Sequence, residues 1–161
     1  MPYQLKVDGM AELSEQLSLM EERAPAVAAK ALYDGAAVMV SEVKQSAQSI
    51  KTAPFKYASD GEMRLPSPEE KEILLSVGAG VAKFDKNGTE VDTSIGYKNA
   101  GYAYLKGKKK PIPQIVNAIN SGTSFMNKQP FVRKAAKSGG PKAIAAMSKA
   151  IETEFEAMTK K

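Results

Sequence analysis

The sequence predicts an α+β fold, in which an N-terminal helical segment and a long helix pack on a small antiparallel sheet and a C-terminal helix follows. Apolar residues recur at three- and four-residue steps near both ends of the chain. The middle instead contains Asn87-Gly88 between two strand-like runs, which is typical of a β-hairpin. With 161 residues and 43% hydrophobic content, residues 1–161 are expected to form a single domain around one core.

The N-terminal region is predicted to be helical over Met10–Gln48, as an α-hairpin or as one bent long helix. Its first apolar face consists of Met10, Leu13, Leu17 and Met20. A second apolar stripe follows from Pro25 onward, at the same helical spacing. Gly35, in the middle of this stripe, either weakens the helix or lets another backbone approach closely.

Two segments, Ile50–Glu72 and Lys106–Asn120, are predicted to be mobile loops that become ordered when partners bind. The first has no apolar periodicity and contains several prolines. The second begins with the exposed basic run Lys106–Lys110. Within it, Pro113–Ile119 has the pattern of a short helix, which Gly122 would end.

Three strands are predicted between these segments. Ile73–Phe84 and Thr89–Tyr97 flank the Asn-Gly turn and form a hairpin, and Tyr102–Leu105 makes a third strand. Tyr102 and Tyr104 share one face of that strand. We expect this face to pack against a helix; the alternative is that the rings stack on nucleic-acid bases.

The C-terminal region is predicted to hold two helical pieces. Pro130–Lys137 starts the first, Ser138-Gly139-Gly140 interrupts it, and Pro141–Met158 forms the terminal helix. The apolar face of the terminal helix consists of Ile144, Met147, Ile151, Phe155 and Met158.

The composition excludes several classes of chemistry. The chain has no histidine and no cysteine, which excludes disulfides, thiolate chemistry, histidine triads and nearly all zinc, iron and copper sites. Two acidic clusters, Glu69–Glu72 and Glu152–Glu156, are predicted to lie on a loop and on a solvent-facing helix stripe, which does not suit a magnesium site. We therefore expect no enzyme activity, no catalytic residue, no metal and no cofactor.

We also expect no contact with a membrane. No apolar run reaches the ~20 residues of a membrane span. The N-terminal residues lack the basic and apolar regions of a signal peptide. The protein is therefore expected to stay in the cytoplasm where it is made.

Charge divides the chain into two halves. Residues 1–80 contain 8 Lys or Arg against 12 Asp or Glu, whereas residues 81–161 contain 15 against 6. No acidic residue lies between Asp92 and Glu152. This bias indicates either contact with an acidic partner or a solvated face that aids solubility. The candidate electrostatic contacts are Lys106, Lys108, Lys109 and Lys110.

The segment from Gly101 to Ala135 is predicted to be an assembly surface. It combines an aromatic strand, a lysine run, a Gly-Thr-Ser turn and a Pro-Phe helix start, with no group that can act alone as acid, base or metal ligand. The candidate interface residues are Gly122, Thr123, Ser124, Pro130, Phe131 and Arg133. The plainer alternatives are that the turn only ends a helix and that Phe131 anchors its helix in the core.

The order of these landmarks resembles the HK97 gp10-like family of tailed-phage proteins. Three stretches carry the resemblance: VDGMAEL with the alanine-rich helix after it, SIGYKNAGYAYL, and INSGTSFMNKQPFVRKA. The last stretch matches best: it contains the Gly-Thr-Ser turn and the Pro130-Phe131 pair with Arg133 and Ala135 nearby. The Tyr-Ala strand of the family pattern falls on Tyr102 and Ala103, in the second stretch. The chain departs from the family pattern by inserting Lys106–Asn120 and by lacking the Thr-Gly-x-Leu element before the first strand.

The resemblance implies a structural virion protein at the phage neck or head-proximal end of the tail, acting as a head-tail connector or tail-completion component. It implies a homo-oligomeric ring, expected to be a hexamer, with tail-tube and head-closure or connector proteins as partners and DNA passing nearby. Such a protein is assembled in the cytoplasm of the bacterial host. The alternative from charge alone is a small basic protein that binds nucleic acid without sequence preference.

Overall fold

The computed structural model describes residues 10–56, 61–81, 85–87, 90–92, 95–98 and 100–159. Within these residues four helices and six short strands confirm the predicted α+β class. In chain order the elements are α1 (Met10–Gln48), α2 (Pro68–Val77), β1 (Gly80–Val81), β2 (Asp85–Asn87), β3 (Glu90–Asp92), β4 (Ile95–Gly96), β5 (Tyr102–Leu105), β6 (Lys108–Pro111), α3 (Ile112–Ser121) and α4 (Phe131–Thr159).

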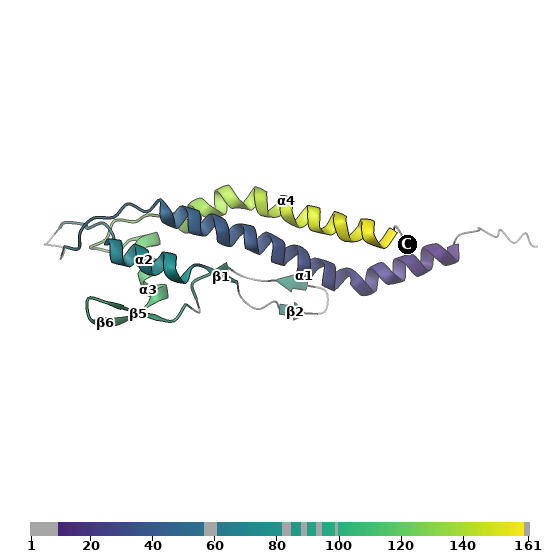
Figure 1. Cartoon of the computed structure of the whole chain (residues 1–161), viewed down its shortest axis with the longest axis horizontal. Coiled ribbons are helices and arrows are strands. Elements are labelled where there is room, and N and C mark those ends of the chain that lie inside the picture. Colours follow the sequence, from purple (N-terminus) through teal and green to yellow (C-terminus); the bar gives the residue numbers. More distant parts are fainter. Residues whose placement is uncertain are drawn as a thin grey trace, which may run out of the picture.

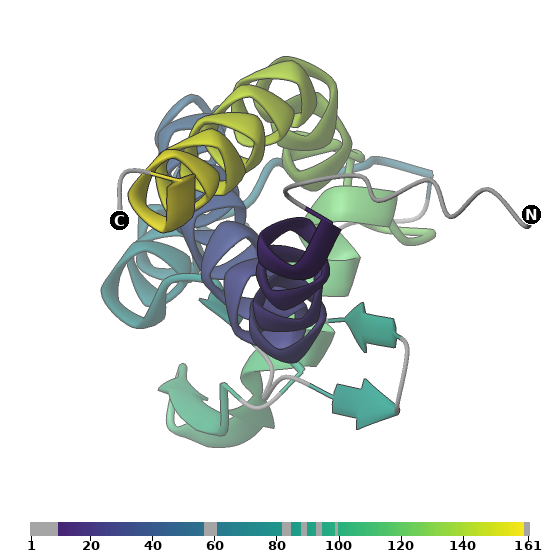
Figure 2. The same cartoon turned by 90° about the vertical axis from the view of Figure 1, so that its right-hand side faces the viewer.

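The two long helices, α1 and α4, pack antiparallel to each other, although residues 49–130 separate them in the sequence. We call this pair the helical hairpin. They lie side by side along the long axis of the molecule, and the strands and short helices lie on the other side of α1 (Figures 1 and 2). Residues 10–48 make one continuous helix, so the bent-helix alternative holds. Figure 1 shows the purple N-terminal part of α1 at an angle to its blue part, and Pro25 is a proline inside this helix.

Gly35 and Gly139 allow the two long helices to approach closely. A Cβ on Gly35 would lie 2.7 Å from Met147 Cγ, and a Cβ on Gly139 would lie 2.9 Å from Glu42 Cγ. Of the two alternatives for Gly35, the structure therefore favours close approach, with the Met147 side chain nearest and the Ala143 carbonyl oxygen at 3.4 Å. The expected break at Ser138-Gly139-Gly140 is wrong, because α4 runs through it and through Pro141. Packing of the small Gly139 against α1 outweighs the low helix propensity of two glycines.

Helix α2 corrects two predictions, since its residues were assigned to a loop and to a strand. Ser67 caps the helix: its hydroxyl accepts from the Glu70 N–H at 3.2 Å, and the Glu70 carboxylate accepts from the Ser67 N–H at 2.8 Å. This capping box, with Pro68 in the first turn, starts the helix. The apolar run after Glu72 continues it instead of forming a strand. Lys71 then ties α2 to the end of α1, donating to the carbonyls of Gln48 and Ile50 at 2.6 and 3.0 Å.

The described strands form three separate antiparallel pairs. Strands β2 and β3 pair with Asn87 opposite Glu90, which agrees with a hairpin around Asn-Gly. Its predicted bounds are wrong, because Asp85–Asn87 were assigned to the turn and form β2, and Gly88 lies outside the described residues. Strand β1 pairs with β4, with Gly80 opposite Gly96. The predicted third strand, Tyr102–Leu105, is confirmed as β5, and it pairs with β6.

The segment Lys106–Asn120 is not a loop. It contains β6 and most of α3, in addition to a two-residue turn. The short helix predicted over Pro113–Ile119 is confirmed as α3, and Gly122 follows it with φ +77° as its C-cap. A large apolar face drives this ordering, because Ile112, Ile115, Val116 and Ile119 are all buried.

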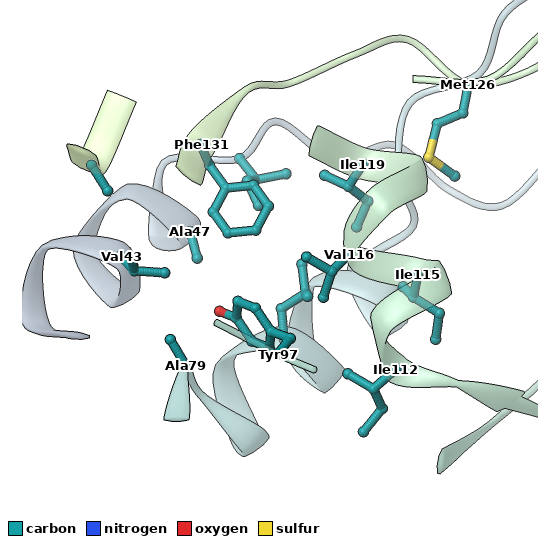
Figure 3. Close-up of a cluster of buried hydrophobic side chains, with 13 residues drawn as sticks. Val43, Ala47, Ala79, Tyr97, Ile112, Ile115, Val116, Ile119, Met126 and Phe131 are labelled. Atoms are coloured by element: carbon teal, nitrogen blue, oxygen red, sulfur yellow. The ribbon is translucent and has the colours of Figure 1, made fainter. Parts of the chain in front are cut away.

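The core lies at the end of the molecule where α1 ends and α4 begins. There α2, α3 and the β5–β6 hairpin lie on the side of α1 away from α4 (Figure 1). We call these elements, together with the end of α1 and the start of α4, the head. In Figure 3 the Phe131 ring points between α3 and the last turns of α1, above Tyr97. The two rings lie edge to face with centroids 6.3 Å apart. The largest fully buried side chains are Phe131, Leu74, Ile119, Met126 and Pro66.

Candidate assembly surface

The β5–β6 hairpin presents the lysine run to solvent. Lys106 and Gly107 form its turn with φ of 51° and 75°. Positive φ at both central residues matches the twist of a two-residue hairpin, and Gly107 adopts it without strain. Lys108, Lys109 and Lys110 follow on β6, and all three are exposed. The predicted exposure of this basic run is therefore confirmed, although the residues form a strand and not a loop.

The aromatic face of β5 is also exposed, which corrects its expected packing against a helix. Tyr102 is 64% exposed and Tyr104 71% exposed, whereas Leu105 on the opposite face is buried. Tyr104 lies opposite Lys109 in the strand pair, and Lys109 Nζ lies 4.8 Å from the centre of the Tyr102 ring. Two tyrosines and a lysine thus form one outward face with a cation–π contact.

Among the contacts described, Lys106 is the lysine of the run that reaches residues outside the β5–β6 hairpin. Its Nζ lies 3.8 Å from Glu69 Oε2 and 5.1 Å from the centre of the Phe55 ring. Both charged side chains of this pair are about half exposed, so the ion pair contributes less than about 1 kcal/mol. Lys108, Lys109 and Lys110 are exposed and belong to none of the salt bridges described.

The Gly-Thr-Ser turn is held in place by backbone contacts. A Cβ on Gly122 would lie 3.0 Å from Lys128 Cβ and 3.1 Å from the Met126 carbonyl oxygen, and φ there is +77°, so glycine is required. The Thr123 N–H donates to the Met126 carbonyl at 3.0 Å. Ser124 is exposed. Gly122 and Thr123 therefore shape the turn, and Ser124 is the residue that the turn presents outward.

The Pro130-Phe131 pair is mainly structural. Phe131 is 2% exposed and belongs to the core of its own chain, so it is not available to a partner in this conformation. Its carbonyl accepts from the Ser46 hydroxyl at 2.8 Å, which joins the start of α4 to α1. Pro130 is half-buried and Arg133 is exposed on the first turn of α4. Of the six candidate interface residues, Ser124 and Arg133 are exposed.

A shallow groove brings the lysine hairpin and the turn together. Its volume is about 260 Å³, and its lining includes Lys110 from β6, Thr123 from the turn and Gln114 from α3. Phe125, which is 47% exposed, also lines it. Arg133 does not. Sequence reasoning did not select Phe125.

The Arg64–Glu70 ion pair lies in the wall of this groove. Arg64 Nη1 and Nη2 each donate to one oxygen of the Glu70 carboxylate at 2.7 Å, and Glu70 is 3% exposed. Burial raises the pKa of this carboxyl, but the hydrogen bonds from Arg64 and from the Ser67 N–H outweigh it, so the pKa lies below its ordinary value. Glu70 is therefore an ionised, structural carboxylate, not part of an acidic metal cluster.

No group of three or more His, Cys, Asp or Glu side chains suited to a metal ion occurs among the residues that the structure describes. In the same residues, no helix has the length and apolar character needed to cross a membrane. A comparison with protein-family models, with curated proteins and with solved structures found no match. The arrangement of the site itself, an exposed aromatic and cationic hairpin beside a fixed polar turn, is suited to binding an acidic macromolecular surface.

Proposed function

We propose that this protein is a ring-forming structural component of the neck or head-proximal tail end of a tailed phage or prophage, acting in tail completion or head-tail joining. The resemblance of its landmarks to the HK97 gp10-like family supports this role. The observation in the structure that carries the proposal is that the two long helices expose large apolar side chains. They include Leu17, Tyr33, Ile144, Ile151 and Phe155.

Such exposure is typical of a subunit whose helices complete their packing in an assembly. Side chains that are between 37% and 62% exposed contribute little to the stability of the isolated chain. Several such side chains exposed on the same long helices support a protein-binding role. A hexameric ring, with tail-tube and head-closure or connector proteins above and below, would cover them.

The charge distribution supports the same role. Salt bridges within the chain join Glu42 to Lys142 and Lys30 to Glu154 across the helical hairpin. The lysines of β6 have no such partner among the salt bridges described. They are available to bind an acidic surface on a neighbouring subunit or the DNA that passes through a neck ring.

Immunogold labelling tests the proposed location directly. Antibody raised against the chain is applied to tailed particles released by the cells that encode it. The expected result is label at the junction between head and tail. Particles that carry no label, or label only at the tail tip, would contradict the proposal.

Charge reversal tests the role of the lysine run. Lys108→Glu, Lys109→Glu and Lys110→Glu, combined in one chain, should weaken association of the ring at low salt. Lys44→Glu, Lys51→Glu and Lys56→Glu make a matched control at exposed lysines elsewhere. Equal association of the two triple variants in sedimentation velocity would show that the lysine run does not contribute.

The exposed Tyr102 and Tyr104 favour a second candidate, sequence-independent binding of single-stranded nucleic acid. Base stacking on such rings contributes about 1–3 kcal/mol per base. Fluorescence anisotropy with a labelled oligothymidylate should then show binding that the triple lysine variant loses and that Tyr102→Ser weakens. Removing three phosphate contacts should lower the slope of log K against log salt by about 2. Indifference of the wild-type chain to the oligonucleotide would exclude this candidate.

A further inference from the structure

The N-terminal part of α1 extends past the end of α4. Lys30 pairs with Glu154, and Gly35 faces Met147. Continuing this antiparallel register places Thr159, the last residue of α4, level with about Pro25. Residues Met10–Ala24, which we call the overhang, therefore run beyond α4 for about 22 Å at 1.5 Å per residue, as Figure 1 shows.

The apolar stripe that packs on α4 continues onto the overhang. Val27, Ala31 and Gly35 are buried along the helical hairpin. Steps of three and four residues place Leu17, Met20 and Ala24 on the same face of α1. Leu17 is 56% exposed. The overhang thus repeats the surface that α1 uses against α4, but the α4 of its own chain does not reach it.

Helix α4 carries a second apolar stripe on its outer side. Ile144, Ile151 and Phe155 are 62%, 37% and 42% exposed, and their spacing of seven and four residues places them on one face. We call them the outer stripe. Gly139, Ala143 and Ala150, which are buried, occupy a different face. The outer stripe is about 17 Å long, so one overhang can cover it.

Charge favours the outer stripe over a second overhang as the partner. The overhang contains four acidic residues, Glu12, Glu15, Glu21 and Glu22, against Arg23 alone. Two overhangs would therefore repel each other. Helix α4 contains five basic residues against the three acidic residues Glu152, Glu154 and Glu156, so it is net positive, whereas the overhang is net negative. Lys137 lies on the same helical face as the outer stripe, seven residues before Ile144. An overhang of about 22 Å can span from Lys137 to Ile151, so its acidic residues can meet this lysine.

We propose that the overhang of one copy docks on the outer stripe of a second copy. The overhang of the second copy remains free to dock on a third, so the contact is head-to-tail and generates a ring or an open filament. This inference rests on the proposed function only for closure into a ring. The contact itself follows from the overhang, the continued stripe and the charges.

Three single variants of the full chain test this contact in sedimentation velocity. Leu17→Asp blocks the overhang, and Ile151→Asp blocks the outer stripe; each should be monomeric where the wild type assembles. Leu19→Asp is the matched control, because Leu19 is 45% exposed and lies about 200° around the helix from Leu17. It should assemble within about twofold of the wild type. Leu17→Ser and Ile151→Ser replace the aspartates if circular dichroism shows lost helix.

Mixing the two blocked variants gives the decisive result. The Leu17→Asp chain keeps an intact outer stripe and the Ile151→Asp chain keeps an intact overhang, so the mixture should form a one-to-one dimer and nothing larger. A dimer of Ile151→Asp alone would instead indicate contact between overhangs, and a dimer of Leu17→Asp alone contact between outer stripes. Either result, or a wild type that stays monomeric at all concentrations, overturns the inference. Label at the head-tail junction in that case would leave the proposed function standing.

Discussion

The head and the helical hairpin are held together by side chains of very different size. The head buries Phe131, Leu74 and Ile119 at 2% exposure or less. The contact between α1 and α4 buries mostly alanine and glycine, such as Ala31, Gly139 and Ala143. A groove of about 370 Å³, lined in part by Ala37, Ala146 and Ala150, remains along this contact.

The head and the helical hairpin therefore obtain their stability from different sources. A large buried side chain contributes about 1.5–3 kcal/mol, whereas a buried alanine contributes only a fraction of this. The head therefore has the packing of a self-sufficient core. The helical hairpin leaves large side chains such as Tyr33 and Ile144 exposed, so a neighbouring molecule that buries them should increase its stability.

The largest effect is expected from Phe131→Ala in the head. Removing this ring leaves a cavity against Tyr97 and α3, so the free energy of unfolding should fall by about 3–5 kcal/mol. Phe125→Ala is the control, because that ring is 47% exposed, and it should change stability by less than about 1 kcal/mol. Urea denaturation of both variants measures this. Equal losses would show that the head has no dominant core residue.

Arg64→Ala should come next, with a loss of about 3 kcal/mol, because it leaves the Glu70 carboxylate buried and unpaired. Lys106→Ala breaks only the exposed contact with Glu69 and should cost less than about 1 kcal/mol. A loss for Arg64→Ala as small as that of Lys106→Ala in urea denaturation would contradict the assignment of a buried ion pair.

The same ion pair should make the head sensitive to acid. Because the pKa of Glu70 is lowered in the folded state, its stabilisation is present above its unfolded pKa of about 4.3 and is lost as pH falls through the folded value. Between neutral pH and pH 3 the wild type should lose more stability than Glu70→Gln. Parallel pH profiles of the two proteins would exclude a contribution from this carboxyl.

Replacing either of two adjacent glycines in the helical hairpin by alanine should change the free energy of unfolding by a smaller amount. Gly139→Ala should lower the free energy of unfolding by about 1 kcal/mol, because its Cβ would meet Glu42 and Met39. A Cβ on Gly140 meets nothing within 4 Å, so Gly140→Ala should raise stability by up to about 1 kcal/mol through helix propensity. Thermal unfolding compares the pair. Stabilisation by both alanines would show that the long helices are less closely packed than described.

Tyr104→Ser should have the smallest effect, within about 0.5 kcal/mol, since the ring is 71% exposed. Urea denaturation measures this change, with Leu105→Ser on the buried face of the same strand as control, for which a loss of several kcal/mol is expected. A large loss for Tyr104→Ser would mean that the aromatic face supports the fold and is not reserved for a partner.

Local signals in the sequence were sufficient for part of the fold. The helical spacing in Met10–Gln48, the Asn-Gly turn and the apolar face of α3 each predicted the element that forms. Helix α2 was missed because its apolar run after Glu72 also suits a strand, although the Ser67-x-x-Glu70 capping box was present in the sequence. The continuity of α4 depends on packing of Gly139 against α1, which no local pattern reveals.

Part of the candidate site could also be predicted from the sequence. The exposure of Lys108–Lys110 follows from charge alone. The alternation in β5 places Tyr102 and Tyr104 on one face but cannot state which face meets solvent, and that depends on where α3 lies. Phe131 was selected as interface and also as core, and the structure places it in the core. The groove beside Thr123 depends on the β5–β6 turn and had no sequence signal.

Pro25 gives α1 one more property. Proline donates no amide hydrogen, so the Glu21 carbonyl lacks its usual partner four residues on, and the helix can bend there at little further cost. In a ring of identical subunits the angle between neighbours is fixed by their number. A helix that reaches its neighbour through such a bend can adjust to that angle. The number of subunits in such a ring would then be set by the partner protein that the ring binds, and the bend at Pro25 would adjust α1 to it.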